Sequence, residues 1–261
     1  SWFEHNGGKT LAFTINKYCH VTFRELPKFF WHKYRIVYSK TELCNKISEI
    51  KHPTVRNVLK YFDIKEGVEI HHFSDLPSRS GIGSSSAFTV ALITAISKHY
   101  KMKLKKKKID EIAIFVEQKM NKEFVGNQDQ IITTFGGFKK ITLKKDFFSV
   151  ENLKLNNLKK IRENSLLLFS GKSRTADKIA KSKVKNIKNK NSTKALLEIK
   201  KTCDMAENVL LSKKLNLKIL GNLMNYSWSN KKKLSKSVSN KFINDYMDIL
   251  NKNNIFGAKV L

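Results

Sequence analysis

The sequence predicts an α+β protein, and three observations support this fold class. A strand pattern, a loop rich in Gly and Ser, and an apolar helix follow one another over residues 68–96. Most other strand patterns precede residue 151, whereas three amphipathic helices occupy the last third of the chain. We therefore expect an N-terminal sheet-and-helix domain over residues 1–160 and a helix-rich C-terminal domain over residues 161–261.

Alternating apolar and polar residues predict the strands that precede the loop. Residues 9–24 are rich in β-branched and aromatic side chains and are expected to form one or two strands. Residues 35–38 and 68–73 continue this pattern. Between them, residues 54–62 carry apolar side chains at helical spacing, which predicts a helix.

The Gly-Ser loop, which we define as residues 77–87, carries the strongest functional signal in the sequence. Its two glycines allow a tight turn and a close approach of the backbone to a ligand. Its serines open the buried helix predicted up to residue 96, where unpaired N–H groups and the positive end of the helix dipole favour a phosphate. The residues expected to hold the phosphates of a nucleotide are Pro77, Ser80, Gly81, Gly83, Ser84, Ser85 and Ser86.

Two better-known glycine patterns do not fit this loop. The Walker pattern needs Lys after its second glycine, but Gly83 is followed by Ser84. The dinucleotide-binding pattern needs a third glycine where Ser86 stands. The simplest non-functional interpretation is a turn that caps a core helix, but such a turn requires neither two glycines nor three serines.

After the loop, the patterns predict two helices and a hairpin. Residues 109–121 form an amphipathic helix on which Glu117 borders the apolar stripe and can point inward. Residues 126–138 form a short helix between glycines, followed by a hairpin over residues 138–150.

The second half of the chain is expected to begin with the polar segment 151–164, which is the best candidate for a domain boundary. Residues 166–169 are all apolar and predict a buried strand. Three helices are then expected, at residues 194–211, 217–230 and 240–251.

The composition is typical of a globular protein, with 41% hydrophobic and 10% aromatic residues. No apolar run reaches the roughly 18 residues that a membrane span requires, and the N-terminus has no signal-peptide pattern. We therefore expect a cytoplasmic protein with no membrane partner. Cys19, Cys44 and Cys203 are odd in number and have no Cys-x-x-Cys spacing, so we expect reduced thiols.

The formal net charge of +29 is the main argument for a different function, because such a chain is attracted to nucleic acid. However, 45 of the 51 basic residues are lysines, and they are spread over the whole chain. Arginine, not lysine, recognises phosphates and bases with fork geometry. We therefore expect no specific nucleic-acid partner, and we expect the Lys-rich run 101–108 to be a solvated loop and helix start.

Phosphoryl transfer from ATP requires a phosphate cradle, oxygen ligands for Mg²⁺ and a group that orients the acceptor hydroxyl. The Gly-Ser loop would supply the cradle, the Ser85 hydroxyl and the Glu117 carboxylate would hold Mg²⁺, and Asp129 would face the acceptor. Each carboxylate also has a simpler interpretation, since Glu117 could lie on a helix surface and Asp129 could stabilise a helix start. The occurrence of all three features in one chain favours the functional interpretation.

The loop resembles the Pro-x-x-x-Gly-Leu-Gly-Ser-Ser-x-Ala signature of the GHMP small-molecule kinases, with Ile82 in the leucine position. This resemblance implies the two-domain GHMP kinase fold, in which an N-terminal ribosomal-S5-like domain holds the loop. It also implies an ATP-dependent phosphotransferase with an alcohol group as acceptor.

Further motifs resemble the D-glycero-D-manno-heptose 7-phosphate kinase branch. They are Gly126-x-Gln-Asp-Gln130 with the following Phe135-Gly-Gly-Phe138, then Ser170-Gly-x-x-Arg174, and Ser227-Trp-x-x-Lys-Lys232. The resemblance implies Asp129 as the catalytic residue, Ser85 and Glu117 as magnesium positions, and Asp129, Gly136 and Arg174 at the substrate. An arginine fork suits the phosphate of an acceptor sugar. The implied reaction converts a heptose 7-phosphate into its 1,7-bisphosphate.

The sequence departs from the branch at both ends. Members open with Pro-Leu-Arg and Gly-Gly-Gly-Thr-Asp motifs and carry a second Gly-rich loop, and these motifs would lie before Ser1 and after Leu261. We therefore expect the nucleotide and sugar sites to be unfinished within these 261 residues, and this piece alone to be inactive. Two alternatives remain open: a GHMP sugar kinase with a different acceptor, and a non-catalytic polyanion-binding protein that keeps the fold.

Overall fold

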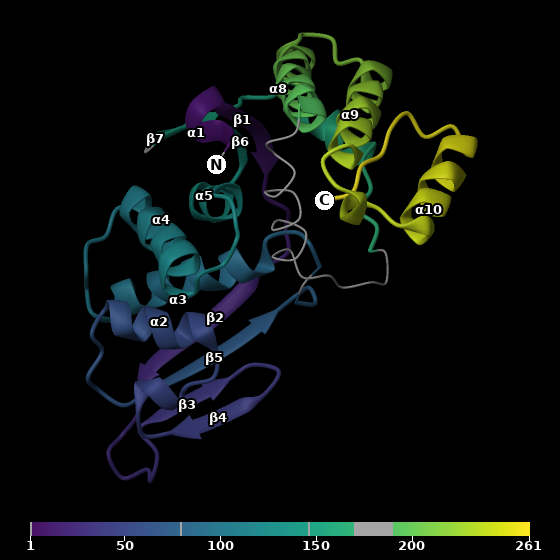
Figure 1. The fold of residues 1–261 in the computed structure, drawn as a ribbon. Helices are drawn as coiled ribbons and strands as arrows, with labels where there is room; N and C mark the ends of the chain where they lie inside the picture. Colours follow the sequence, from purple (N-terminus) through teal and green to yellow (C-terminus); the bar gives the residue numbers. More distant parts are fainter. Residues whose placement is uncertain (1, 79, 146, 170–189) are drawn as a thin grey trace. The chain divides into compact units, whose positions relative to one another are not determined.

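The computed structural model describes residues 2–78, 80–145, 147–169 and 190–261, and the chain divides into two compact units (Figure 1). Unit 1 consists of residues 1–13 and 137–261, and unit 2 consists of residues 14–136. The first strand belongs to unit 1 because it pairs with a strand that follows residue 137. These units are defined by residue contacts and do not coincide with the domains expected from the sequence, 1–160 and 161–261. The expected domain boundary stays a prediction.

Unit 2 contains a four-stranded sheet in the order β2-β5-β3-β4. The strands are β2 (Cys19–Glu25), β3 (Tyr34–Val37), β4 (Thr41–Cys44) and β5 (Val68–Ser74). β5 runs parallel to β3 and antiparallel to β2, so it occupies the interior of the sheet and leads directly into the Gly-Ser loop. The strands expected at residues 35–38 and 68–73 are thereby confirmed.

The helices of unit 2 pack on this sheet and on one another. They are α2 (Pro53–Tyr61), α3 (Ser84–His99), α4 (Lys106–Phe115) and α5 (Gln128–Phe135), with the short η1 (Ile47–Glu49) and one π-helical turn, η2 (Val116–Met120). α3 is apolar on most of its surface because it lies between β2 on one side and α2, α4 and α5 on the other. The core contains Ile36, Val58, Leu59, Ile70, Leu92, Ile93, Ile96 and Ala113.

Unit 1 contains a three-stranded antiparallel sheet in the order β1-β6-β7. Its strands are β1 (Gly8–Phe13), β6 (Phe138–Lys144) and β7 (Phe147–Asn152), so the expected hairpin is confirmed. Its helices are α1 (Trp2–Asn6), α6 (Leu158–Glu163), α8 (Lys190–Leu211), α9 (Leu217–Lys232) and α10 (Lys241–Lys252), with η3 (Lys236–Val238) between the last two. The three C-terminal helices expected from the sequence are therefore confirmed.

Ion pairs fix α8 to the sheet of unit 1. Lys9 on β1 pairs with Asp204 and with Glu207, which lies 3.1 Å from its Nζ. Lys140 on β6 lies 3.1 Å from Glu207 and 2.9 Å from Glu151 on β7. Glu207, which is largely shielded from solvent, thus links α8 to β1 and β6, and Glu151 connects β7 to the same network through Lys140.

The prediction of a buried strand over residues 166–169 is wrong. The structure has no strand there, and the four side chains are exposed, Leu166 by 82%. A short apolar run forms a strand only where another strand offers hydrogen bonds, and none of the described strands pairs with this segment.

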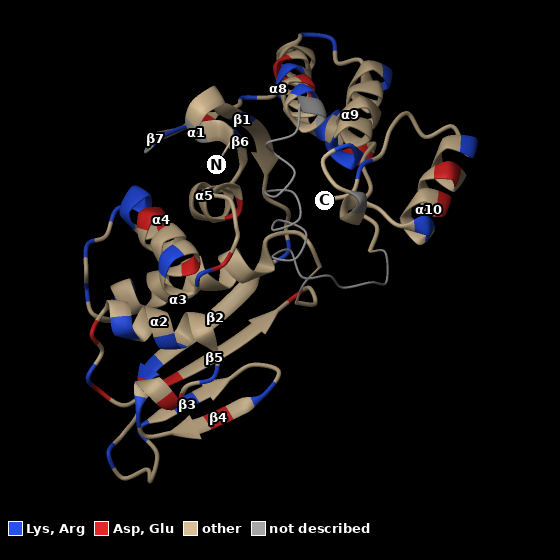
Figure 2. Cartoon of the chain, in the orientation of Figure 1, with Lys and Arg blue, Asp and Glu red and all other residues tan. Residues whose placement is uncertain are grey.

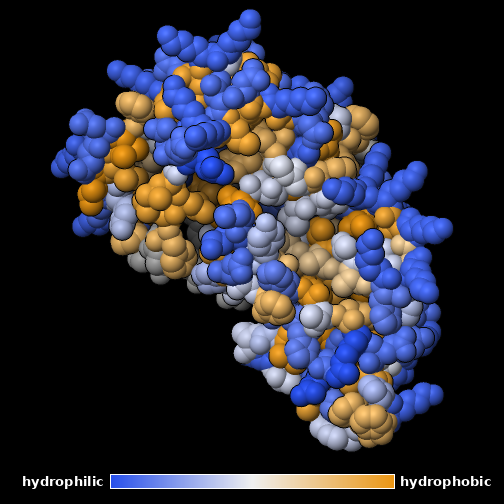
Figure 3. Space-filling model, turned by 180° about the vertical axis from the view of Figure 1, so that it is seen from behind, coloured by the Kyte–Doolittle hydropathy of each residue, from blue (hydrophilic) through white to orange (hydrophobic). Residues whose placement is uncertain are grey.

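Basic residues are distributed over both units, and acidic ones occur among them along the chain (Figure 2). The run 101–108 is a loop that ends in the exposed first turn of α4, as expected. Hydrophobic residues also reach the surface between hydrophilic ones (Figure 3). Among the described residues, none of the helices combines the length and hydropathy needed to cross a bilayer. The three cysteines are free thiols.

Candidate active site

The Gly-Ser loop turns sharply at its two glycines. Gly81 and Gly83 have φ angles of 85° and 77°, in the left-handed region that strains residues with a side chain. Gly83 is the N-cap of α3, and none of the described side chains caps this end of the helix. The first N–H groups of α3 therefore receive no cap from the described side chains and can donate to a ligand. Open N–H groups at a helix start bind phosphate in many proteins.

The serines of the loop differ in their surroundings. Ser84 is half-buried and Ser85 is exposed, whereas Ser86 is only 4% exposed. The Ser80 Oγ atom is buried and has no hydrogen-bond partner among the described residues. Such an orphaned hydroxyl is available to a ligand atom.

Glu117 is completely buried against the start of α3. Ser86 Oγ donates a hydrogen bond to its Oε2 atom over 3.0 Å, and Gln130 Nε2 donates to the same oxygen over 2.5 Å. Glu117 lies in the π-helical turn η2, and such turns are frequent at functional sites. The expectation that Glu117 points inward is confirmed.

The environment of Glu117 controls its ionisation. Burial raises the pKa of Glu117, and hydrogen bonds from Thr89, Ser86 and Gln130 oppose this shift because they stabilise the charged form. Its second oxygen, Oε1, has no hydrogen-bond partner in the part of the chain that the structure describes. A buried carboxylate oxygen without a donor fits one ligand position of Mg²⁺, which takes few protein oxygens and several from water or substrate. The described residues hold no cluster of three or more acidic, His or Cys ligands.

Asp129 lies against the Gly-Ser loop. It stands in the first turn of α5, and a Cβ atom added at Gly83 would lie 3.2 Å from both Cβ and Cγ of Asp129. Gln118 positions the segment before α5, because its Nε2 atom donates to Asn127 Oδ1 over 2.7 Å and to the Val125 carbonyl over 3.0 Å. The loop, Glu117 and Asp129 thus all belong to unit 2 and meet around the N-terminus of α3.

The remaining predicted site residues are Pro77, Gly136 and Arg174. Pro77 precedes the glycines and is exposed. Gly136 ends α5 with a φ of 67° and has open space around its Cα. Arg174 falls outside the described residues, so its role at the substrate stays a prediction.

Sequence reasoning placed Ser86 at the phosphates but missed its contact with Glu117, and it assigned no role to Gln130 or Asp110. The structure brings Ser86, and not the exposed Ser85, to the Glu117 carboxylate. Gln130 belongs to a recognisable motif, but the motif alone predicts no role for its side chain. Asp110 is fully buried, and neither of its oxygens has a hydrogen-bond partner among the described residues. Its position seven residues before Glu117 on the same helical face could have revealed it.

The sequence around this site was compared with known protein families. A family model described as "GHMP kinases N terminal domain" matches residues 46–137, a range that contains the Gly-Ser loop, Glu117 and Asp129. The match covers most of unit 2.

Two curated relatives are kinases of sugars. The chain is 28% identical over 178 residues to D-glycero-alpha-D-manno-heptose 7-phosphate kinase from Campylobacter jejuni, covering 66% of this chain and 51% of that protein. It is 30% identical over 140 residues to galactokinase from Thermotoga neapolitana, covering 51% of this chain and 39% of that protein. The chain therefore spans about half the length of the first relative and less of the second.

The fold resembles that of solved sugar kinases. A D-glycero-D-manno-heptose 1-phosphate kinase from Bacteroides thetaiotaomicron superposes with a TM-score of 0.74 at 20% identity, covering 99% of this chain and 78% of the other. Together with the matched domain, this similarity confirms the expected α+β fold. Residues 46–137 are thus similar to the N-terminal domain of the GHMP kinases, and the chain has a fold similar to that of a solved kinase.

Proposed function

We propose that the protein transfers the γ-phosphoryl group of ATP to a hydroxyl of a sugar. One observation carries this proposal: Ser86 of the first turn of α3 holds the buried Glu117 carboxylate, while Asp129 touches Gly83 on the loop before that turn. A phosphate cradle and two acidic groups around one helix N-terminus are the parts that phosphoryl transfer requires.

In this proposal the loop binds and orients the triphosphate. The N–H groups at the start of α3 would donate to phosphate oxygens, and Ser80 Oγ is a further available donor. Asp129 would orient the acceptor hydroxyl and receive its proton as the oxygen attacks the γ-phosphorus and ADP leaves. Positioning and charge stabilisation supply most of the rate of such reactions.

Glu117 is the residue that would hold magnesium, together with a serine hydroxyl of the loop. When bound, Mg²⁺ would neutralise charge on the phosphates of ATP. The Oε1 atom of Glu117, which no described residue pairs, and the burial of this side chain support the role, because an ionised buried carboxylate requires a cation or donors nearby. The sequence assigns Ser85 to the metal, whereas the contact with Glu117 favours Ser86.

For the acceptor, we propose a heptose 7-phosphate that is phosphorylated at its anomeric hydroxyl. The similarity to the Campylobacter jejuni heptose 7-phosphate kinase covers more of the chain than the similarity to galactokinase and supports this choice. Arg174 is the residue predicted to bind the 7-phosphate.

The acceptor is tested by assaying ATP turnover of the full-length protein with D-glycero-D-manno-heptose 7-phosphate, mannose and galactose. Turnover with the heptose 7-phosphate at least tenfold faster than with the other two sugars would support the proposal. Turnover only with an unphosphorylated sugar would instead support the galactokinase-like alternative, which the Thermotoga neapolitana relative favours.

A further inference from the structure

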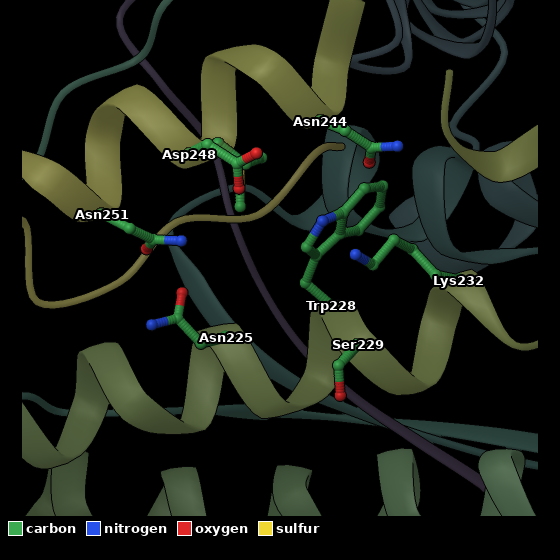
Figure 4. A pocket seen from close by; sticks show the side chains of 8 residues that line it. Asn225, Trp228, Ser229, Lys232, Asn244, Asp248 and Asn251 are labelled. Atoms are coloured by element: carbon green, nitrogen blue, oxygen red, sulfur yellow. The ribbon is translucent and has the colours of Figure 1, made fainter. Parts of the chain in front are cut away.

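A polar pocket lies between α9 and α10 of unit 1, and none of the residues that line it is assigned a function above. Its cavity volume is about 240 Å³, and Figure 4 shows side chains from both helices converging on it. Trp228 and Lys232 line it from α9, and Met247, Asp248 and Asn251 line it from α10. Pockets for drug-sized ligands measure roughly 300–1,000 Å³, so this one suits a smaller molecule, the size of roughly eight waters.

The floor of the pocket contains an unpaired donor. Trp228 is only 3% exposed, and its indole Nε1 atom is buried without a hydrogen-bond partner among the described residues. Buried N–H groups are normally paired, because leaving one unpaired costs about 1–3 kcal/mol. In Figure 4 the indole stands between the two helices with the polar side chains around it. A ligand that accepts a hydrogen bond would satisfy this group.

The rim supplies both signs of charge and an amide. Lys232 and Asp248 project from opposite helices, and the described residues offer neither of them an ion pair or a hydrogen bond. Asn251 likewise has no hydrogen bond to the described residues. By contrast, Asn225 and Asn244 at the same pocket already bind Ala258 and Ser239. Four groups of the pocket thus have no partner among the described residues. They are the Trp228 indole N–H, the Lys232 ammonium, the Asp248 carboxylate and the Asn251 amide.

This set of groups selects the chemistry of the ligand. A purely anionic ligand would meet the Asp248 carboxylate, and an apolar ligand would leave the indole N–H and the amide unpaired. A ring that carries several hydroxyls can donate to Asp248, accept from Trp228 and Lys232, and place its C–H face on Met247. Each hydroxyl both donates and accepts, so one neutral molecule satisfies the whole set.

We propose that this pocket binds a monosaccharide-sized polyol at a site formed by α9 and α10. The inference does not depend on the proposed phosphoryl transfer, because it concerns only residues of unit 1 and can be tested without ATP. It also gives a role to the Ser227-Trp-x-x-Lys-Lys232 motif, which the proposed active site does not use.

The test uses the full-length protein in which Trp2 and Trp31 are replaced by Phe. Trp228 is then the only tryptophan within residues 1–261, and its fluorescence reports on the pocket. D-mannose and D-galactose are titrated without nucleotide, with glycine and inorganic phosphate as comparison ligands. We expect a saturable change with at least one sugar, at a Kd on the order of 1 mM, and a weaker response to glycine and phosphate.

Two matched variants test the location. Asp248→Ala should weaken sugar binding at least tenfold, whereas Asp245→Ala, which removes a carboxylate from the same helix outside the pocket, should leave it within twofold.

Two further variants test the donor and the separation from the proposed active site. Trp228→Phe keeps an aromatic ring and removes the N–H donor, and it should weaken sugar binding measured by calorimetry. Asp129→Asn should leave binding unchanged, which separates this pocket from the proposed acceptor site.

Three results would overturn the proposal. They are no saturable response to either sugar, tighter binding of glycine or phosphate than of the sugars, and equal sugar affinity in Asp248→Ala and Asp245→Ala. Circular dichroism of each variant establishes that a loss of binding does not reflect unfolding. Failure of the kinase assay would leave all of these outcomes unaffected.

Discussion

The backbone of Gly83 lies so close to the side chain of Asp129 that a Cβ atom at position 83 would be 3.2 Å from the Asp129 Cγ atom. Gly83 also has a φ of 77° and precedes the first turn of α3. The same residue therefore shapes the loop and leaves room for the carboxylate. This contact connects the loop to the acidic residue that we propose orients the acceptor hydroxyl.

Replacing Gly83 by alanine tests this connection. Gly83→Ala should destabilise the protein by about 1–3 kcal/mol because of left-handed strain, and it should lower ATP turnover at least tenfold because the added methyl group displaces Asp129. Thermal unfolding and a turnover assay measure the two effects. Gly126→Ala is the control, since its Cβ would meet nothing within 4 Å, and equal losses in both variants would contradict the account.

The Ser86 hydroxyl is predicted to support Glu117, and Ser85 provides a matched comparison. Ser86→Ala should cost about 1–3 kcal/mol of stability because a buried carboxylate loses a donor. It should also raise the Mg²⁺ concentration needed for half-maximal turnover. Ser85→Ala should leave stability within about 0.5 kcal/mol, because Ser85 is exposed. If Ser85→Ala alone changed the magnesium dependence, the sequence-based assignment to Ser85 would be preferred.

Several features of this site follow from local sequence. The glycines of the loop predict its left-handed turns, and the apolar run after them predicts the buried helix α3. The position of Glu117 beside the apolar stripe of its own helix predicts that its side chain is buried. Such patterns depend on residues within a few turns of each other, so the sequence alone predicts them.

Other features depend on contacts between distant residues, which the sequence alone does not predict. The choice of Ser86 over Ser85 follows from the rotation of α3 relative to η2. The assignment of β1 to unit 1 follows from its pairing with β6, more than a hundred residues away. The apolar residues 166–169 matched a strand in composition, but a strand also requires a partner, which composition does not reveal.

Asp110 is predicted to destabilise the protein at neutral and alkaline pH. Burial, with the nearby Glu111 and Glu117 charges, raises the pKa of Asp110 from 3.8 to about 7. The folded state therefore binds a proton that the unfolded state releases between these values, so stability falls as pH rises from about 4 to 7. At about 1.4 kcal/mol per pH unit, the full cost above pH 7 is roughly 4 kcal/mol.

Asp110→Asn removes this cost, so it should raise the free energy of unfolding at pH 8 more than at pH 5. Urea unfolding at both pH values measures the difference. Glu111→Gln changes the exposed neighbouring carboxylate on the same helix, and its effect on the free energy of unfolding should differ little between the two pH values. A variant that is equally or less stable at pH 8 would show that Asp110 has a stabilising partner when ionised.

His52 should make the protein sensitive to acid. Burial and the charge of His72 lower the pKa of His52 from 6.5 to about 4. The neutral form is therefore favoured in the folded state, and the associated stability is present above pH 6.5 and is lost as pH falls toward 4. The loss corresponds to roughly 3 kcal/mol.

His52→Asn keeps a side-chain acceptor at the N-cap of α2 and removes the titrating ring. Its stability should change less between pH 6.5 and 4 than that of the unchanged protein, as measured by thermal unfolding across this range. His5→Asn, at an exposed histidine, serves as the control. An unchanged pH profile in His52→Asn would place the acid sensitivity elsewhere.

The central claim is that Asp129 acts on the acceptor hydroxyl beside a loop that binds ATP. The most direct measurement compares ATP turnover and ATP affinity of the full-length protein with those of Asp129→Asn, at saturating sugar phosphate. We predict that turnover falls by about 10²–10⁴ while the Kd for ATP stays within threefold. An Asp129→Asn variant that retains turnover would contradict the account.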